Sequence, residues 1–124
     1  MDQKFFICEN CGNIVTPVND SGTSLVCCGD KMTELIPGAI KASKEMHVPV
    51  WSVRNCAVYV KVGAKEHPML PVHYIELIAV QTKQGFQLKH LRPGDKPEAR
   101  FALCAGDEVE AVFAYCNLHG LWKA

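Results

Sequence analysis

Four cysteines lie within the first 36 residues, in a segment with too little apolar material to fold unaided. They form two pairs, Cys8 and Cys11 in CENCG and Cys27 and Cys28 in VCCGD, and a glycine directly follows each pair. Glycine lets the backbone turn so that amide groups can approach sulfur. Four thiolates that converge on one metal ion would cross-link the segment and contribute folding free energy directly. A metal site is therefore predicted, and unligated or disulfide-linked cysteines are the alternative.

The identity of this metal is less constrained, because zinc and iron both accept four thiolates in a tetrahedral arrangement. Cys27 and Cys28 are neighbours in the sequence, and adjacent residues do not easily place both sulfurs at ideal tetrahedral angles. A zinc ribbon would normally use a second spaced pair. The adjacency favours iron in a distorted site, and zinc remains open.

The chain as a whole is small and balanced in charge. Its 124 residues are 48% hydrophobic, which suffices for one modest core and a small appendage. Thirteen basic residues balance thirteen acidic ones, so the overall charge indicates neither a nucleic-acid nor a membrane partner. No apolar run approaches the roughly 18 residues of a membrane span, and the N-terminus does not read as a secretion signal. We expect a cytoplasmic protein, in which cysteines are metal-bound or free more often than disulfide-linked.

Short runs rich in Val, Ile, Phe and Tyr follow the cysteine segment and predict β-strands. Several alternate with period two, as Val58, Val60 and Val62 do. Turn formers separate most runs at the spacing of an antiparallel sandwich, and no segment has helical periodicity over ten residues. We predict an all-β protein with a small metal-knuckle domain at residues 1–36 and an immunoglobulin-like antiparallel β-sandwich at residues 37–124. The runs expected as strands are 47–53, 57–63, 73–82, 85–91, 99–105 and 108–115.

Four of the five histidines fall at predicted strand ends or in loops, and a Cys-x-x-His pair follows the last predicted strand. Side chains from distant parts of a chain can meet at one end of a sandwich. A single loop histidine is most often a surface residue, so spacing alone leaves the cluster an open question. Imidazoles suit iron, copper and zinc, and a lone thiolate among them suggests a redox-tuned metal. The residues concerned are His47, His67, His73, His119 and Cys116.

Seven motifs resemble, in order and over almost the whole chain, those of the desulfoferrodoxins, the two-iron superoxide reductases; they are CENCG, VCCGDKM, KEMHVPV, VGAKEHPM, HYIE, PGDKPEARF and YCNLHGLWKA. The resemblance implies a small desulforedoxin-like domain that holds one iron on four cysteines. It also implies a second, catalytic iron with four equatorial imidazoles and one axial thiolate. The implied ligands are Cys8, Cys11, Cys27 and Cys28 for the first iron, and His47, His67, His73, His119 and axial Cys116 for the second.

The resemblance also implies an activity. In the family, ferrous iron at the second site transfers one electron to superoxide, two protons are added, and hydrogen peroxide leaves with its O–O bond intact. An external donor, commonly rubredoxin, then reduces the site again, and the small domains pair into a homodimer. Five protein ligands leave one octahedral position open for a small substrate. Glu45 matches the family glutamate that occupies this sixth position in the ferric state, although its side chain could simply be a solvated carboxylate.

The chain departs from the family pattern at Met46. Many members have a lysine there, whose charge attracts superoxide and whose ammonium group helps to order water for protonation. A methionine side chain carries no charge and donates no hydrogen bond. Either the attraction is weaker or another cation takes its place. Lys44, which we assign to the catalytic site, and Lys65 are the candidates, and the alternative is that both are solvated surface residues.

Other conspicuous residues are assigned structural roles. Cys56 and Cys104 match no ligand motif and are expected to be buried or partly buried small hydrophobes. His90 is expected to be a sheet residue, and Tyr115 and Trp122 to pack around the metal-binding turn. Two other functions remain open, a non-catalytic iron protein that transfers electrons and a structural zinc-binding interaction module. Optical spectroscopy separates them, because ferric thiolate sites are coloured and zinc sites are not.

Overall fold

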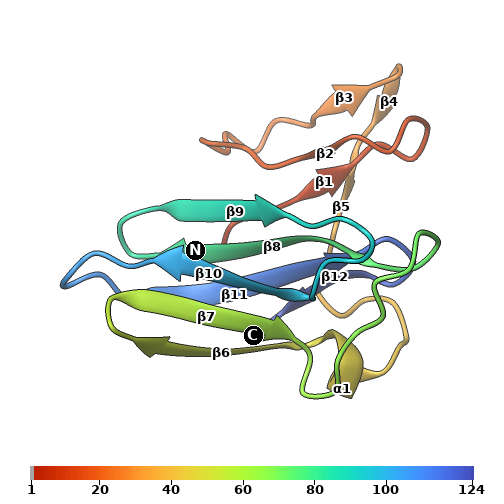
Figure 1. Ribbon diagram of the computed structural model, residues 1–124. Coiled ribbons are helices and arrows are strands. Elements are labelled where there is room, and N and C mark those ends of the chain that lie inside the picture. Colours follow the sequence, from red (N-terminus) through yellow and green to blue (C-terminus); the bar gives the residue numbers. More distant parts are fainter. Residues whose placement is uncertain (1) are drawn as a thin grey trace. The chain divides into compact units, whose positions relative to one another are not determined.

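The computed structural model describes residues 2–124 and divides the chain into two compact units (Figure 1). The first unit ends at Ile36 and the second runs from Pro37 to Ala124. Apart from one four-residue helix, the regular structure of both consists of antiparallel strands, so the predicted all-β fold class is confirmed. Among residues 2–124, no helix has the length and hydrophobicity needed to cross a membrane.

The first unit consists of very short strands. One sheet has the order β2-β1-β5, and β3 pairs with β4 in a separate two-stranded sheet. Of residues 2–36, only Phe5 and Cys8 are buried, so apolar burial contributes little to the stability of this unit. The strands are β1 (Phe6–Ile7), β2 (Ile14–Val15), β3 (Val26–Cys27), β4 (Asp30–Lys31) and β5 (Thr33–Glu34).

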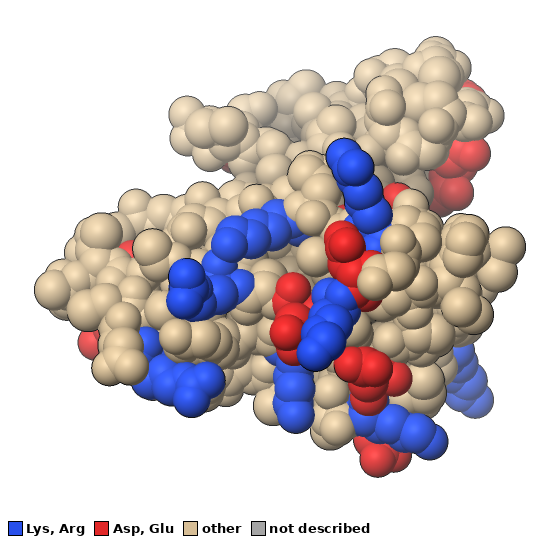
Figure 2. Space-filling view, viewed as in Figure 1, with Lys and Arg blue, Asp and Glu red and all other residues tan. Residues whose placement is uncertain are grey.

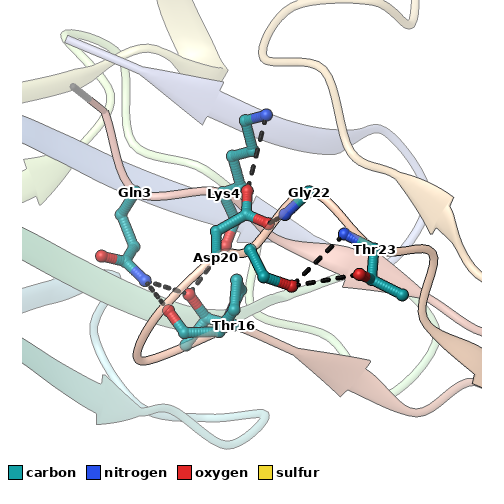
Figure 3. Close-up of polar contacts among 8 residues, drawn as sticks. Gln3, Lys4, Thr16, Asp20, Gly22 and Thr23 are labelled. Atoms are coloured by element: carbon teal, nitrogen blue, oxygen red, sulfur yellow. Dashed lines mark hydrogen bonds and ion pairs between the residues drawn. The ribbon is translucent and has the colours of Figure 1, made fainter.

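Polar contacts join the N-terminal segment to the loop that follows β2 (Figure 3). Gln3 donates from Nε2 to the hydroxyl of Thr16 at 2.7 Å, and this hydroxyl donates to the Lys4 carbonyl at 2.7 Å. Asp20 accepts a hydrogen bond from the Gly22 amide at 2.9 Å and lies 3.6 Å from Nζ of Lys4. Because these groups are largely exposed, each contact stabilises the unit only slightly.

The second unit is a sandwich of two antiparallel sheets, with strand orders β10-β7-β6 and β12-β11-β8-β9. The alternating valines of β7 are buried and pack in one core with β8, β10 and β11. The most buried core residues include Val58, Ile78, Val80 and Phe101, all at most 1% exposed. The strands are β6 (Pro49–Arg54), β7 (Ala57–Val62), β8 (Ile75–Thr82), β9 (Phe86–His90), β10 (Glu98–Ala102), β11 (Val109–Cys116) and β12 (Gly120–Lys123).

A single-turn helix, α1 (Lys44–His47), precedes β6 and lies at one end of the sandwich (Figure 1). Ser43 caps it, because its hydroxyl accepts a hydrogen bond from the Met46 amide at 3.3 Å. The helix ends at His47 because Val48 precedes Pro49, and the residue before a proline is restricted to extended backbone; Val48 has φ −70° and ψ 122°. Four residues are too few to produce a helical period, so the sequence pattern did not predict this turn.

Two expectations about the second unit are wrong. Cys56 and Cys104 are exposed, not buried. Cys56 follows Asn55 in the β6–β7 turn, where both residues have positive φ, and Cys104 lies in the connection between β10 and β11. The chain also does not stop pairing after β11. Residues 120–123 form β12, so the Cys-x-x-His motif lies in a β-hairpin and not on a free terminal turn.

The charged side chains on the face of the second unit seen in Figure 2 are of mixed sign, with Lys and Arg lying among Asp and Glu. This matches the equal numbers of basic and acidic residues, thirteen of each. Attraction of an anion must therefore come from a few charges close to its binding site.

Candidate metal centres

The four N-terminal cysteines converge on one point of the first unit. Cys8 and Cys11 follow β1, Cys27 ends β3 and Cys28 begins the turn to β4. Their four sulfur atoms all lie within 4.8 Å of one another. Sγ of Cys27 is 3.6 Å from Sγ of Cys11 and 3.9 Å from Sγ of Cys28. Cys8 is buried, whereas Cys11 and Cys28 are exposed.

Both cysteine pairs lie on turns that need left-handed backbone. Gly12 has φ 81° and Gly29 has φ 79°, a region that glycine adopts without steric cost. The amide of Gly12 donates to the Cys8 carbonyl at 2.8 Å, which closes the first turn. Cys28 itself has φ 54°. A left-handed second cysteine is one way for adjacent residues to direct both sulfurs to the same point, and it accounts for a pairing that extended backbone would not allow.

The four thiols compete for protons in the absence of a cation. Backbone amides, chiefly that of Cys11, lower the pKa of Cys8 to about 7. Hydrogen bonding among the thiols raises the pKa of Cys28 to about 12, with Cys11 as the main partner, and raises that of Cys27, with Cys8 as the main partner. Four thiolates at this spacing cannot all ionise unless a cation balances their charge. The donor set fits a metal ion that accepts four sulfurs, as iron and zinc do.

Four imidazoles form a square at one end of the second unit. Neighbouring ring centroids are 4.7 to 5.1 Å apart, with interplanar angles of 77° to 87°, and the diagonal from His47 to His73 is 6.4 Å. Ligand atoms of His47, His67, His73 and Cys116 all lie within 4.8 Å of one another. Nδ1 of His119 lies 3.1 Å from Nε2 of His47 and 3.8 Å from Sγ of Cys116. The structure thus brings together all five side chains that the sequence singled out.

These five residues come from three separate stretches of the chain. His47 is the last residue of α1. His67 and His73 lie in the connection between β7 and β8. Cys116 is the last residue of β11, and His119 lies in the turn that leads to β12. The sandwich therefore has to form before the square can, because only the fold brings these stretches together.

The β7–β8 connection holds α1 in place. The Lys65 amide donates to the Glu45 carbonyl at 3.0 Å, and the His67 amide donates to the Val62 carbonyl at 2.9 Å. The two segments approach so closely that a Cβ atom on Gly63 would lie 2.6 Å from the Glu45 carbonyl oxygen. Only glycine permits this approach without a shift of the backbone.

Two of the imidazoles are oriented by backbone carbonyls. Nδ1 of His47 donates to the Ser43 carbonyl at 2.7 Å, and Nδ1 of His67 donates to the Pro68 carbonyl at 2.6 Å. A neutral imidazole has one N–H, so both Nε2 atoms present lone pairs, and they are only 3.2 Å apart. Facing lone pairs repel unless a cation lies between them. Nε2 of His73 is likewise buried, without a hydrogen-bond partner among residues 2–124.

Burial keeps these imidazoles neutral. Desolvation lowers the pKa of His67 to about 4 and also lowers the pKa values of His47 and His73. Burial raises the pKa of the Cys116 thiol, so this sulfur needs a nearby cation in order to ionise. At neutral pH the nitrogen lone pairs are free, as metal binding requires. A set of four nitrogens and one sulfur suits a redox-active metal such as iron.

Trp122 packs beside the square, as predicted. Its ring centroid is 5.1 Å from that of His47, and its Nε1–H donates to the His119 carbonyl at 3.0 Å. Trp122 is 4% exposed and Tyr115, on β11, is 7% exposed. These aromatic side chains limit the access of water to the cluster.

The residues assigned to catalysis outside the square lie on α1. Glu45 and Lys44 both have exposed side chains, and so does Lys65 on the adjoining loop. Among residues 2–124 none of the three takes part in an ion pair. Their charged groups are therefore free to interact with a small anion.

A hollow of about 460 Å³ lies beside His67. Met46, Glu66 and Lys96 also line it, whereas the two lysines singled out in the sequence do not. Lys96 is exposed and makes no ion pair among residues 2–124. Sequence reasoning did not find it because it precedes β10, far from any ligand in the sequence. The only available signal was its place in the motif PGDKPEARF.

The sequence is similar to one family over nearly its whole length. Residues 39–124 match the family described as Desulfoferrodoxin, and residues 2–35 match the one described as Desulfoferrodoxin, N-terminal domain. The desulfoferrodoxin of Syntrophotalea carbinolica is 45% identical over 121 residues, which cover 98% of this chain and 94% of the relative. That of Nitratidesulfovibrio vulgaris is 43% identical over 121 residues, with the same coverage of 98% and 94%.

Solved structures give the same result. The superoxide reductase from Treponema pallidum superimposes with a TM-score of 0.85 at 36% identity, and the match covers 100% of this chain and 99% of that one. The superoxide reductase (1Fe-SOR) from Giardia intestinalis superimposes with a TM-score of 0.55 at 34% identity. That match covers 65% of this chain and 96% of the Giardia chain.

Proposed function

Because this chain belongs to the desulfoferrodoxin family, we propose that it is a superoxide reductase whose active site is the square of histidines with Cys116. One superoxide, one electron and two protons give one hydrogen peroxide, and the O–O bond stays intact. The observation that supports this site most strongly is the pair of facing Nε2 lone pairs on His47 and His67, 3.2 Å apart. Such a pair is stable only with a cation.

The chain offers two donor sets, four sulfurs in the first unit and four nitrogens with one sulfur in the second. Both are consistent with the two iron centres of the family. When bound at the second set, ferrous iron would supply the electron for superoxide. We assign the sulfur set a structural role, since the unit that contains it has almost no core.

The residues of the chain prepare the second site. Carbonyls of Ser43 and Pro68 fix which nitrogen of His47 and His67 carries the proton, so the other nitrogen is free. Burial of Cys116 keeps water away from its sulfur, which is 0% exposed. A thiolate ligand donates electron density to the metal, and this favours transfer of an electron to the substrate.

Glu45 is proposed to occupy the sixth position between turnovers. Its carbonyl is held by the Lys65 amide, but its side chain is exposed and makes no ion pair among residues 2–124. The carboxylate can therefore approach the site and leave it while the backbone stays in place. A fixed backbone with a mobile carboxylate suits a side chain that leaves the sixth position when superoxide binds.

Local lysines are proposed to attract the substrate in place of a lysine at position 46. Lys44 and Lys65 adjoin the site in the chain, and Lys96 lines the hollow beside His67. Glu66 and Asp95 line the same hollow and oppose the charge of Lys96. One unit charge at several ångströms in a mostly aqueous setting contributes on the order of 1 kcal/mol. Association with superoxide should therefore be slower than with a lysine at position 46, by about tenfold at most.

Three further features are proposed on the family pattern. Rubredoxin or a similar small protein would reduce the site after each turnover. The chain would form a homodimer through its first unit, since a unit in which only Phe5 and Cys8 are buried among residues 2–36 gains most from burial against a second copy. The protein would act in the cytoplasm.

The test is a superoxide pulse given anaerobically to the reduced protein, with metal analysis, peroxide and dioxygen measured together. We expect a coloured protein with iron in both clusters, peroxide formation without dioxygen, and consumption of donor electrons. A colourless protein that holds only zinc would support an interaction module instead. Release of dioxygen would indicate a dismutase, and a coloured protein that forms no peroxide would be an electron carrier.

A further inference from the structure

Asn117 joins the loop that carries His73 to the turn that carries Cys116 and His119. Its side-chain oxygen accepts a hydrogen bond from the Tyr74 amide at 2.9 Å. Its side-chain nitrogen donates to the Val72 carbonyl at 3.0 Å, and its backbone amide donates to the Tyr74 carbonyl at 3.2 Å. The three hydrogen bonds therefore attach Val72 and Tyr74, the residues on both sides of His73, to Asn117.

These bonds begin where the regular sheet ends. The pairing of β8 with β11 stops at Ile75 opposite Cys116, after an irregularity between Tyr115 and Cys116. The segment before β8 and the segment after β11 are no longer paired as strands. The side chain of Asn117 continues the connection, with one donor and one acceptor that replace those of a backbone.

His73 depends on this connection more than the other histidines do. Its backbone amide and carbonyl pair with Leu70 at 3.0 and 2.9 Å, within the same loop, and this does not attach the loop to β11. Its ring has no carbonyl contact among residues 2–124 comparable to those that orient His47 and His67. The position of the ring is therefore set by its backbone, whose neighbours Asn117 holds.

We infer that Asn117 is a positioning residue, which holds His73 in register with Cys116 and His119 so that the metal is retained. The inference rests on the proposed function only for the identity of the metal. A carboxamide is the appropriate group, because one donor and one acceptor must act at once. The substitution Asn117→Asp would keep the acceptor for the Tyr74 amide and lose the donor for the Val72 carbonyl, whereas Asn117→Ala would lose both.

The variants Asn117→Ala and Asn117→Asp should therefore both lose the second metal faster than the unchanged protein. Groups that orient metal ligands from behind typically change metal affinity by about 10- to 100-fold. We expect iron to leave Asn117→Ala about tenfold faster than the unchanged protein, near the lower end of that range. Asn117→Asp should also lose iron faster than the unchanged protein, because it keeps the bond to the Tyr74 amide but turns a carboxylate oxygen towards the Val72 carbonyl oxygen.

The experiment measures transfer of iron from the second site to an excess of chelator, followed by the absorption of the Cys116 thiolate bound to iron. Gln87→Ala is the matched control. Its Nε2 donates to the Ala102 carbonyl at 2.7 Å, so the variant loses a side-chain bond to backbone in the same unit but outside the square. Thermal unfolding of each variant shows how far general destabilisation contributes.

Faster iron loss and a shifted absorption in Asn117→Ala, with neither change in Gln87→Ala, would support the inference. Equal acceleration in both variants, or no acceleration in Asn117→Ala, would overturn it. Should Asn117→Ala fail to fold, Asn117→Asp decides, because iron loss at the unchanged rate overturns the inference and faster loss supports it. Superoxide assays on the unchanged protein test the proposed function separately. A protein that holds iron but forms no peroxide would contradict that function and leave the chelator comparison intact.

Discussion

The two units of this protein present metal ligands in opposite ways. In the first, Cys11 and Cys28 are exposed, and only two of residues 2–36 are buried. In the second, His47, His67 and Cys116 are at most 3% exposed and lie at the end of a continuous apolar core. We therefore expect the first unit to need its metal in order to fold, and the second unit to fold around its apolar core and to prepare its site in advance.

The contrast has a functional consequence. A site that forms only with its metal must give every donor to that metal, and four sulfurs leave a tetrahedral ion without an open position. A site prepared by a fold can supply five donors and leave a sixth position for substrate. The arrangement supports the proposal that chemistry belongs to the second unit and a structural role to the first.

The largest expected effect comes from exchanging one ligand in each unit. Cys116→Ser should remove the sulfur ligand of the second site, its charge-transfer absorption and most of the peroxide formation, while the first unit keeps its metal. Cys11→Ser should leave peroxide formation at the second site in place and remove the metal from the first unit. The loss of one thiolate from a unit with almost no core should unfold residues 2–36. Metal content, visible spectra and peroxide assays of the two variants test this division.

One result for Cys11→Ser would contradict this division of roles between the two units. If Cys11→Ser abolished all reductase activity while the second site kept its iron, the first site would be an obligatory electron relay and not a structural element.

Acid should distinguish the two units, since all five histidines lie outside the first one. In the metal-free protein the pKa of His67 is about 4, below its ordinary value of 6.5, and those of His47 and His73 are also lowered. Between pH 6.5 and about 4, these imidazoles bind protons in the unfolded chain but not in the folded unit. The free energy of unfolding of the second unit should therefore fall as pH decreases from about 6.5 towards about 4.

Urea midpoints of the chelator-treated protein at pH 7.5 and 5.5 measure this effect, and we expect the lower midpoint at pH 5.5. His90→Gln is the control, because His90 lies on β9, outside the square, and the difference should persist in it. Identical midpoints at the two pH values would show that the imidazoles are not held in the buried, neutral state.

Gly63→Ala should disturb the support of α1. The added Cβ would lie 2.6 Å from the Glu45 carbonyl oxygen and 2.9 Å from the Met46 carbonyl carbon, so the backbone must shift. Overpacking of this kind typically lowers the free energy of unfolding by about 1–3 kcal/mol. Gly85→Ala is the matched control, because a Cβ there meets nothing within 4 Å. Equal urea midpoints for the two variants would mean that the β7–β8 connection does not hold α1 rigidly.

The smallest expected effect concerns charge near the open position. Met46→Lys should raise the second-order rate with superoxide by up to about tenfold, since one unit charge contributes on the order of 1 kcal/mol. The rate should also fall more steeply with ionic strength. If Met46→Lys changes neither property while Lys44→Met, Lys65→Met or Lys96→Met lowers the rate, that lysine already attracts the substrate. If none of the four variants matters, local attraction is the wrong account.

The strands of the second unit were largely predictable because their alternation survives in the sequence. Val58, Val60 and Val62 mark β7 without reference to any other segment, and all three are buried. The single turn of α1 and the short β12 were not predicted. Both are four residues long, and their existence depends on a cap at Ser43 and on pairing with β11. Exposure of Cys56 was also missed, because it follows from turn geometry and not from hydrophobicity.

The ligand set could be named from the motifs, but its geometry could not. Spacing gives no information on which nitrogen of each imidazole faces the metal. In the structure Nε2 of His47 and His67 faces the centre because backbone carbonyls occupy Nδ1, whereas His119 presents Nδ1. These contacts come from Ser43 and Pro68, whose roles only the folded chain reveals. In the sequence, Asn117 lies between the ligands Cys116 and His119. The hydrogen-bond partners of its side chain are on the β7–β8 connection, which spacing does not reveal.

The most direct test of the contrast between the units is an amide NMR spectrum of the protein before and after removal of both metals. Our account predicts that residues 37–124 keep dispersed signals close to those of the metal-bound protein, with changes confined to the loops of the square. It predicts that signals of residues 2–36 collapse to positions typical of an unfolded chain. Dispersed signals for residues 2–36 without metal, or collapse of the sandwich signals, would contradict it.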